Sequence, residues 1–176
     1  FRFVTLGSFK KYIMETLQNK VALITGGTKG IGYGIAQSLL KQGIHVAITS
    51  RSLAAAKKAA ELLNKDSNTT AKAIGLEADV RSLESQEAAV NEVKKEFGKL
   101  DIVIANAGLG HFGSIEDLTK DQWNETIDTN LTGVFNSIKA SVSALKETKG
   151  YYITISSLAG TNFFAGGSAY NASKFG

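Results

Sequence analysis

The sequence contains no cysteine, which excludes disulfide bonds, thiol catalysis and cysteine-ligated zinc. It contains only two histidines, His45 and His111, so a histidine-rich metal site is not expected and no metal is assigned. His45 lies in a strand pattern, which favours a packed or edge residue over a metal ligand. No apolar run approaches the roughly 20 residues that a membrane-spanning helix needs, so no membrane partner is expected.

The body of the chain also lacks an excess of charge of one sign. The formal net charge is +4, but residues 1–13 contain Arg2, Lys10 and Lys11 and no acidic residue. The rest of the chain is therefore near neutral and has no basic stripe of the kind that a nucleic-acid backbone requires. We expect no nucleic-acid partner and a cytoplasmic location.

Residues 1–13 differ from the rest of the chain because they are rich in phenylalanine and show no clear period. They also lack the apolar core and small-residue cleavage site of a secretory signal. Met14 is the only methionine, and a short polar segment separates it from the first strand pattern. We therefore predict that Met14 is the natural start and that residues 1–13 are a non-native or disordered extension. A genuine N-terminal arm is the alternative.

A glycine-rich turn, residues 25–32, follows the apolar run Val21–Ile24 and opens a helical pattern in which Ile31, Ile35 and Leu39 recur at i, i+4 and i+8. A buried strand followed in sequence by a glycine-rich turn and the N-terminus of a helix can form an anion-binding site. The first N–H groups of the helix have no partner within it and carry a partial positive charge.

The glycines of this turn have separate expected roles. Gly26 permits a sharp turn, Gly30 lets the backbone approach a pyrophosphate, and Gly32 lets the helix pack closely on the strand. The spacing G-x-x-x-G-x-G is neither the commonest dinucleotide fingerprint nor a P-loop. Taken alone, the turn is also compatible with an ordinary strand–helix connection.

The residues at the end of the second strand indicate which dinucleotide the site prefers. The strand pattern 44–49 ends at Ser50 and Arg51, and no acidic residue stands there to bind a ribose 2′-hydroxyl. Arg51 and Lys29, which lies inside the glycine turn, would instead attract a 2′-phosphate. We therefore predict NADP(H) rather than NAD(H); the alternative is that both cations merely face solvent.

The remaining patterns alternate between strand and helix, which implies a parallel sheet with right-handed crossovers. Ser52 is a predicted N-cap, Thr119 begins a capping box, and Asp79 ends the third strand, where it could accept a bond from adenine or cap a turn. Strands are expected at 21–24, 44–49, 71–80, 100–105 and 151–156, and helices at 31–42, 53–63, 82–97, 119–149 and 168–176.

Tyr170 and Lys174 are four residues apart, so they share one face of the last predicted helix. A tyrosine hydroxyl has a reference pKa of ~10, and a nearby ammonium group favours the phenolate, which makes the pair a usable general acid or base. Ser157 ends a strand, where ligands of open α/β sheets bind, and its hydroxyl could hold a substrate carbonyl oxygen. In isolation, however, Tyr-x-x-x-Lys is also typical of a solvated helix face.

Together these motifs resemble the short-chain dehydrogenase/reductase family over residues 20–176. The matching residues are Thr25, Gly26, Gly30, Ile31, Gly32, Asp79, Val80, Asn106, Ala107, Gly108, Asn130, Ser157 and the run from Tyr170 to Lys174. The resemblance implies an α/β fold, a Rossmann-like doubly wound parallel sheet of strand order 3-2-1-4-5, and an NADP-binding domain over residues 14–176.

The resemblance also implies a proton relay. Tyr170 would be the acid/base, Lys174 would tune it and hold the nicotinamide ribose, and Ser157 would orient the substrate oxygen. Asn130 would hold a water that links Lys174 to solvent. The cofactor would be bound by Gly26, Thr28, Lys29, Gly30, Ile31, Gly32, Arg51, Asp79, Val80, Asn106, Ala107, Gly108, Tyr170 and Lys174.

Two features depart from the family pattern. Ala105 stands where the family often has a second asparagine, and the sequence stops just after Lys174. Family members continue through two more strands and a substrate lid, so we expect a C-terminally truncated piece that is inactive by itself. The full-length protein would form a homodimer or homotetramer.

The expected activity is hydride transfer between NADP(H) and a small-molecule carbonyl or alcohol. A 3-oxoacyl-thioester reductase is favoured on resemblance, while a sugar or polyol dehydrogenase and a steroid-like reductase remain open. A non-catalytic NADP-binding or regulatory protein is the alternative from another class.

Overall fold

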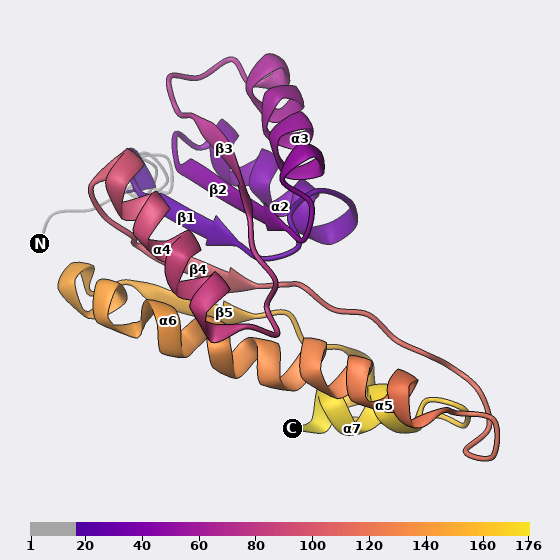
Figure 1. Cartoon of the computed structure of the whole chain (residues 1–176). Helices are drawn as coiled ribbons and strands as arrows, with labels where there is room; N and C mark the ends of the chain where they lie inside the picture. The colour runs from indigo at the N-terminus through magenta and orange to yellow at the C-terminus, as the bar shows by residue number, and fades with distance from the viewer. Residues whose placement is uncertain (1–16) are drawn as a thin grey trace, which may run out of the picture.

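The computed structural model describes residues 17–176, so the interpretation of residues 1–13 and of Met14 lies outside the described residues. Five parallel strands form one sheet in the order β3-β2-β1-β4-β5, as predicted (Figure 1). The strands are β1 Val21–Ile24, β2 His45–Ser50, β3 Ala73–Glu77, β4 Ile102–Ala105 and β5 Tyr151–Thr154.

Helices cover both faces of the sheet (Figure 1). They are α2 Gly30–Lys41, α3 Leu53–Asp66, α4 Leu83–Phe97, α5 Lys120–Ile127, a π-helical segment Asp128–Thr132, α6 Gly133–Thr148, a 3₁₀ turn Leu158–Gly160 and α7 Ser168–Phe175. Among residues 17–176, none of these helices has both the length and the apolar character needed to cross a bilayer.

Strand β1 is buried on both sides, as expected for the centre of a doubly wound sheet. Because side chains alternate along a strand, Ala22 and Ile24 pack against α2 and α3, whereas Val21 and Leu23 pack against α4 and α6. The two hydrophobic cores therefore meet at β1, and they hold the turns at its carboxyl end in place.

The predicted caps are confirmed. The Ser52 hydroxyl accepts a hydrogen bond from the Ala55 N–H, and Thr119 and Gln122 form a reciprocal capping box at α5. Helix α4 ends at Gly98, which has a left-handed φ of 79°. These termini depend on local hydrogen bonds, which explains why the sequence was sufficient to predict them.

Several boundaries shift by one to three residues from the prediction, and β5 ends at Thr154 rather than at 156. Three larger differences concern the buried stripe of a helix, the end of a strand and the interior of a helix. Helix α2 buries Gly32, Ala36 and Leu40, so the stripe through Ile31 was misplaced by one residue and Ile31 is 66% exposed. Strand β3 ends at Glu77, before the predicted end at 80, because the chain then turns around Asp79. The long predicted helix 119–149 contains a π-helical segment at its centre.

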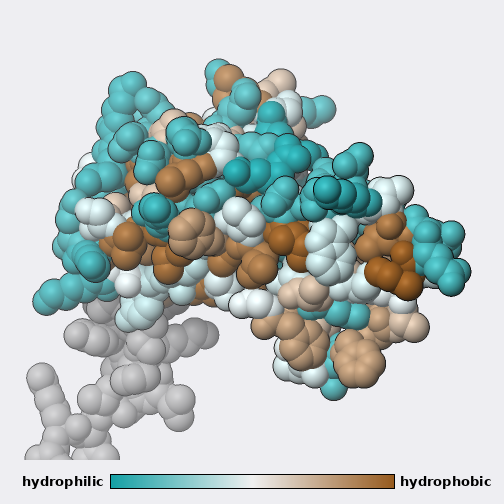
Figure 2. All heavy atoms as spheres, turned by 60° about the horizontal axis from the view of Figure 1, so that its bottom comes forward, coloured by the Kyte–Doolittle hydropathy of each residue, from teal (hydrophilic) through white to brown (hydrophobic). Residues whose placement is uncertain are grey.

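The edge strand β5 and the outer face of α6 expose apolar side chains. Tyr151 and Ile153 on β5 are 71% and 47% exposed, and Phe135, Ile138 and Val142 on α6 are also exposed. Figure 2, which brings the side of α6 and α7 forward, shows hydrophobic side chains gathered along this face. A surface of this kind is typical of a protein–protein contact.

Candidate active site

A cleft of about 550 Å³ lies at the carboxyl end of the sheet, where the turns after β1, β2, β3 and β4 converge. Ligands of open α/β sheets bind at this position. Its lining consists of Gly26, Thr28, Lys29, Gly30, Ile31, Ser50, Arg51, Ala78, Asp79, Val80, Arg81, Asn106, Ala107, Gly108, Leu109 and Thr129. Most of the predicted cofactor-binding residues are therefore brought together, whereas Gly32, Tyr170 and Lys174 are not part of this lining.

Hydrogen bonds join the glycine turn to the turn after β4. The Thr25 hydroxyl accepts from the N–H groups of Asn106 and Ala107, each at 3.0 Å. The Asn106 side-chain amide donates to the carbonyls of Thr25 and Gly26 at 2.9 and 3.1 Å. Two turns that are far apart in the sequence are thus fixed relative to each other on the floor of the cleft.

The geometry explains three of the four glycines in the turn. Gly26 has a φ of +65°, and a Cβ there would lie 2.9 Å from the Ala107 Cα. A Cβ on Gly32 would lie 2.5 Å from the Asn106 Nδ2 and 2.7 Å from the Gly26 carbonyl, so glycine here lets α2 pack closely on the two turns rather than on the strand itself. Gly30 has a φ of +58° with open space around it, so its conformation is what requires glycine there.

Asn130 connects the cleft to helix α7. It lies in the π-helical segment and is only 4% exposed. Its amide oxygen accepts from the Leu109 N–H at 2.9 Å, and its Nδ2 donates to the Leu109 carbonyl at 2.7 Å and to the Ser173 hydroxyl at 3.0 Å. A π turn widens the helix, and such turns are frequent at functional sites. Its predicted role in holding a water stays a prediction.

Tyr170 and Lys174 lie on one face of α7, as predicted from their spacing. The Lys174 Nζ lies 5.7 Å from the centre of the Tyr170 ring and donates to the Ile155 carbonyl at 3.0 Å. Ser157 accepts from the Ala159 N–H at 3.2 Å and caps the 3₁₀ turn. Lys174, which lies on the same helix as Tyr170, binds the backbone just beyond the end of β5, and Ser157 is held by a backbone N–H in the same region.

The rings of Phe112 and Phe164 surround Tyr170. Their ring centres lie 5.4 and 6.5 Å from that of Tyr170, with Phe112 in an edge-on arrangement. These residues come from the loop after β4 and the loop before α7. The tyrosine thus lies beside an apolar wall that both loops build.

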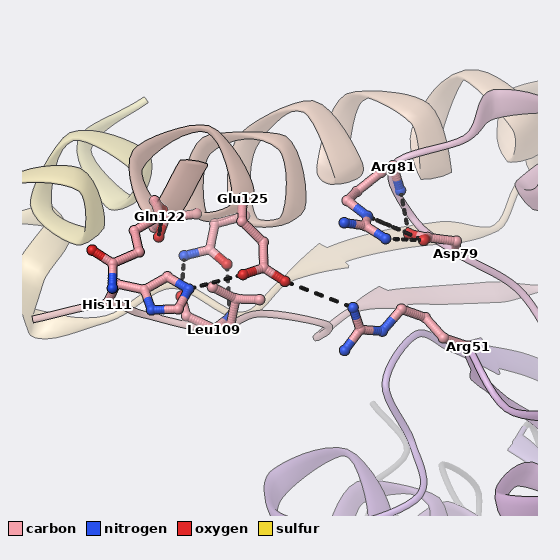
Figure 3. Close-up of polar contacts among 9 residues, drawn as sticks. Arg51, Asp79, Arg81, Leu109, His111, Gln122 and Glu125 are labelled. Atoms are coloured by element: carbon pink, nitrogen blue, oxygen red, sulfur yellow. Dashed lines mark hydrogen bonds and ion pairs between the residues drawn. The ribbon is translucent and has the colours of Figure 1, made fainter. Parts of the chain in front are cut away.

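Two ionisable residues that the sequence reasoning missed, Glu125 and His111, lie beside the predicted cleft residue Arg51 (Figure 3). Arg51 points toward Glu125 of α5, with 3.8 Å between Nη1 and the carboxylate, and Glu125 also bonds His111 at 2.9 Å. The hydrogen bond from His111, reinforced by the nearby cations, lowers the pKa of the Glu125 carboxyl. Only the tertiary fold brings these three residues together, so no sequence motif marks them.

Arg81, which lines the cleft, was also missed, and it forms an ion pair with Asp79. Its Nη2 lies 2.6 Å from the Asp79 carboxylate, and both residues line the cleft. This hydrogen bond lowers the pKa of Asp79 and raises the pKa of Arg81. A basic residue two positions after Asp79 was the available sequence indication. Asp79 does cap a turn, because it accepts from the Arg81 N–H at 3.0 Å.

His45 is a packed residue, as predicted. Its ring stacks on Phe97 with 5.0 Å between centres, and its Nδ1 accepts from the Lys72 N–H at 3.0 Å. Burial, followed by the nearby Lys72 and Lys99, lowers the pKa of His45. The residue lies at the start of β2, away from the cleft.

The doubly wound sheet, its strand order and the glycine turn at the cleft define a Rossmann-type α/β protein. The short chain dehydrogenase family model matches residues 20–176. The chain belongs to the short-chain dehydrogenase family, and the resemblance seen in the motifs is confirmed.

Individual relatives agree with this assignment. The chain is 38% identical to trans-4-hydroxycyclohexanecarboxylate dehydrogenase of Sinomonas cyclohexanicum, over 93% of this chain and 64% of that protein. It is 36% identical to the 3-oxoacyl-acyl-carrier-protein reductase FabG of Salmonella typhimurium, over 92% of this chain and 64% of that protein. The chain thus spans slightly less than two thirds of the length of these curated relatives.

A solved structure shows the same fold. Alcohol dehydrogenase from the archaeon Thermococcus sibiricus, complexed with 5-hydroxy-NADP, superimposes with a TM-score of 0.83 at 35% identity. The match covers 89% of this chain and 66% of that one.

Proposed function

We propose that the protein is an NADP(H)-dependent oxidoreductase acting on a carbonyl or alcohol, with Tyr170 as its general acid/base. The observation that carries this proposal is the Asn130 bridge, which joins Leu109 at the cleft to Ser173 on the helix of Tyr170 and Lys174. This bridge would couple the cleft proposed to hold the dinucleotide to the helix that carries the proposed general acid/base.

The start of helix α2 fits a pyrophosphate. Lys29 at its N-cap makes no side-chain capping bond, and no acidic residue lies in the first turn. By contrast, hydroxyl side chains cap α3, α4 and α5. An uncapped terminus that faces a cleft keeps its N–H groups available for an anionic ligand.

The cations of the cleft support NADP(H) over NAD(H). Lys29 and Arg51 both line it, and β2 ends at Ser50 without a carboxylate that would repel a 2′-phosphate. Glu125 pairs with Arg51 from outside this lining, and the pair is long and exposed, so its energetic cost to phosphate binding is small. The solved relative with a bound NADP derivative agrees with this preference.

The catalytic roles follow from chemistry at the end of β5. When bound, the nicotinamide would supply or accept the hydride. Tyr170 would donate the proton to the substrate oxygen in reduction, and Lys174 would hold the nicotinamide ribose. Ser157 would hold the same oxygen through its hydroxyl, and Asn130 would hold a water toward Lys174.

The substrate class rests on the residues around Tyr170. Phe112 and Phe164 supply an apolar wall, which suits an acyl chain better than a sugar. With the FabG relatives, this favours a 3-oxoacyl-thioester reductase. The exposed apolar face of α6 supports a homodimer or homotetramer of the whole protein.

The variant Tyr170→Phe tests the proposal. We expect the rate of NADPH oxidation with a 3-oxoacyl thioester to fall by roughly 10²–10⁴-fold, since a general acid contributes about that much. The dissociation constant for NADPH should stay unchanged, because the cleft keeps its lining. Both are measured on the protein as expressed from its own gene. An unchanged rate would refute the role of Tyr170, and NADPH binding by that wild-type protein without turnover would favour the non-catalytic alternative.

A further inference from the structure

The Glu125 carboxylate contacts two basic side chains, one through each of its oxygens (Figure 3). Its Oε2 lies 2.9 Å from the His111 Nε2, in the loop after β4. Its Oε1 lies 3.8 Å from the Arg51 Nη1, directly after β2. Thr129, which lines the cleft, follows Glu125 by four residues, so Glu125 lies one helical turn from the lining. An acidic side chain is therefore placed beside a cation that faces the cleft.

The two contacts of Glu125 differ in strength. The bond to His111 is short and holds the carboxylate in place. That bond, followed by the nearby cations, lowers the pKa of Glu125, so the carboxylate carries its charge at neutral pH. The contact with Arg51 exceeds hydrogen-bond distance. It is a long, exposed ion pair, which can be exchanged for a better partner.

Arg51 differs from the other arginine of the cleft. Within residues 17–176 its guanidinium makes no hydrogen bond, its one ion pair is the contact with Glu125, and its side chain is 63% exposed. Arg81, by contrast, places its Nη2 2.6 Å from the Asp79 carboxylate. Arg51 is therefore the arginine that can turn toward a ligand, and Glu125 is the acid that holds it back.

A ribose 2′-phosphate is a stronger partner for a guanidinium than this carboxylate is. A phosphate monoester carries about −1.5 to −2 charges at pH 7 and three acceptor oxygens, so it can bind a guanidinium through two nitrogens. The ion pair in the structure joins one nitrogen to one oxygen at 3.8 Å. Arg51 can therefore leave Glu125 for a 2′-phosphate, whereas a 2′-hydroxyl has no negative charge with which to compete.

We propose that Glu125 is a specificity-determining residue that competes with the 2′-phosphate for Arg51 and thereby limits the preference of the cleft for NADPH over NADH. This inference rests on the proposed binding of NADP(H) in the cleft. Glu125 keeps its contact with Arg51 in the free protein and in the complex with NADH, and it loses that contact only to NADPH. Part of the binding free energy of NADPH is thus used to separate the pair.

The variant Glu125→Gln tests the inference, because it removes the charge, keeps the shape and retains groups that can hydrogen-bond to His111. The dissociation constants of NADPH and NADH are measured by titration calorimetry at low ionic strength, where exposed pairs are screened least. We expect NADPH to bind about two- to fivefold more tightly to the variant and NADH to bind unchanged, since an exposed pair is worth up to about that factor. Unchanged NADPH affinity, or an equal gain for both cofactors, would overturn the proposal.

A second background shows whether the effect depends on Arg51. In an Arg51→Ala protein, Glu125→Gln should leave the dissociation constant of NADPH unchanged, because the side chain for which the two anions compete is gone. A gain as large as that in the wild-type background would show that Glu125 repels the phosphate directly. That result would contradict competition for Arg51.

Glu147→Gln is the matched control for the loss of one negative charge. Glu147 is exposed and pairs with Lys94 at 3.1 Å. It lies at the end of the sheet opposite the cleft, because the next residue, Thr148, bonds the Leu100 carbonyl ahead of β4. Its replacement should leave both dissociation constants unchanged. An NADPH gain equal to that of Glu125→Gln would show that net charge alone is responsible and would contradict the proposal.

The same titrations separate this inference from the proposed function. All are made on the protein as expressed from its own gene, and circular dichroism confirms the fold of each variant. A folded wild-type protein that binds neither cofactor would overturn the proposed function, and this inference with it. A wild-type protein that binds NADPH, with no change in Glu125→Gln, would overturn this inference alone.

Discussion

We call the side of the sheet where the parallel strands begin the amino edge and the side where they end the carboxyl edge. These two sides use polar residues in opposite ways. At the amino edge, the Asp101 carboxylate binds Lys20 at 2.8 Å, the Val21 N–H at 3.0 Å and Lys99 at 3.3 Å. At the carboxyl edge, Lys29 and Arg51 lie around the uncapped start of α2. At the amino edge this buried carboxylate is fully paired, whereas at the carboxyl edge Lys29 has no ion pair among residues 17–176 and Arg51 has only a long one.

The difference separates residues that hold the fold from residues that bind a ligand. Asp101 is 3% exposed and ties β1 to β4, so its bonds are made within the protein. The cleft is rigid where its turns meet, through Thr25 and Asn106, but it is open where a phosphate would lie. A binding site is pre-organised when hydrogen bonds fix its backbone while the groups that would contact the ligand stay available.

The largest effect is expected from Gly32→Ala, which disrupts the packing between the two turns at the carboxyl edge. The new Cβ would lie 2.5 Å from the Asn106 Nδ2 and 2.7 Å from the Gly26 carbonyl, so the two turns must separate. We expect a loss of about 1–3 kcal/mol in the free energy of unfolding, together with at least tenfold weaker NADPH binding. Urea unfolding and calorimetric titration measure the two effects.

Gly34→Ala is the matched control for this variant. Gly34 lies two residues further along α2, on a different face of the helix, and a Cβ there meets nothing within 4 Å. Its replacement should leave NADPH binding unchanged and stabilise the helix by up to about 1 kcal/mol. Equal behaviour of the two alanine variants would show that close packing at Gly32 does not support the cleft.

The next largest effect is expected from Asn130→Ala, which removes the bridge between the carboxyl edge and α7. The partly buried N–H and carbonyl of Leu109 would lose their partner, and the buried Ser173 hydroxyl would lose a donor. An unsatisfied buried group costs about 1–3 kcal/mol, so the thermal midpoint should fall. Asn130→Asp keeps the acceptor for the Leu109 N–H but loses both donated bonds, so it serves as the comparison. Unchanged melting of both variants would contradict the bridging role.

The smallest effect concerns the amino edge and depends on pH. Burial by itself raises the pKa of Asp101, but the hydrogen bonds from Lys20 and the Val21 N–H outweigh it, and the pKa lies below its ordinary value of 3.8. The unfolded chain therefore binds a proton first as pH falls, so this contribution to stability is complete above that value and is lost below it.

We expect Asp101→Asn to be less stable than the wild type at neutral pH and to show a flatter decline in unfolding free energy below pH ~4. Urea unfolding across pH measures both. Glu92→Gln, which removes an exposed pair with Lys95, is the control and should change stability little. Parallel curves for wild type and Asp101→Asn would contradict the stabilising role of the pair.

The fold was predictable because its determinants are local or periodic. The apolar run of β1, the hydroxyl caps at Ser52 and Thr119 and the glycine turn each act within a few residues. The helix after Thr119 was harder, because the π turn around Asn130 depends on bonds to Leu109 and Ser173, which lie far away in the sequence.

The sequence by itself therefore determined the alternation of strands and helices, the family, and the residue types that meet at the carboxyl edge. The spacing of Tyr170 and Lys174 on one helix face needs no tertiary contact, because helical geometry alone sets it. The tertiary structure alone decided which groups are already paired. Arg81 forms an ion pair with Asp79, and Glu125 forms contacts with both Arg51 and His111. The tertiary packing brings these partners together, although the composition would allow other pairings.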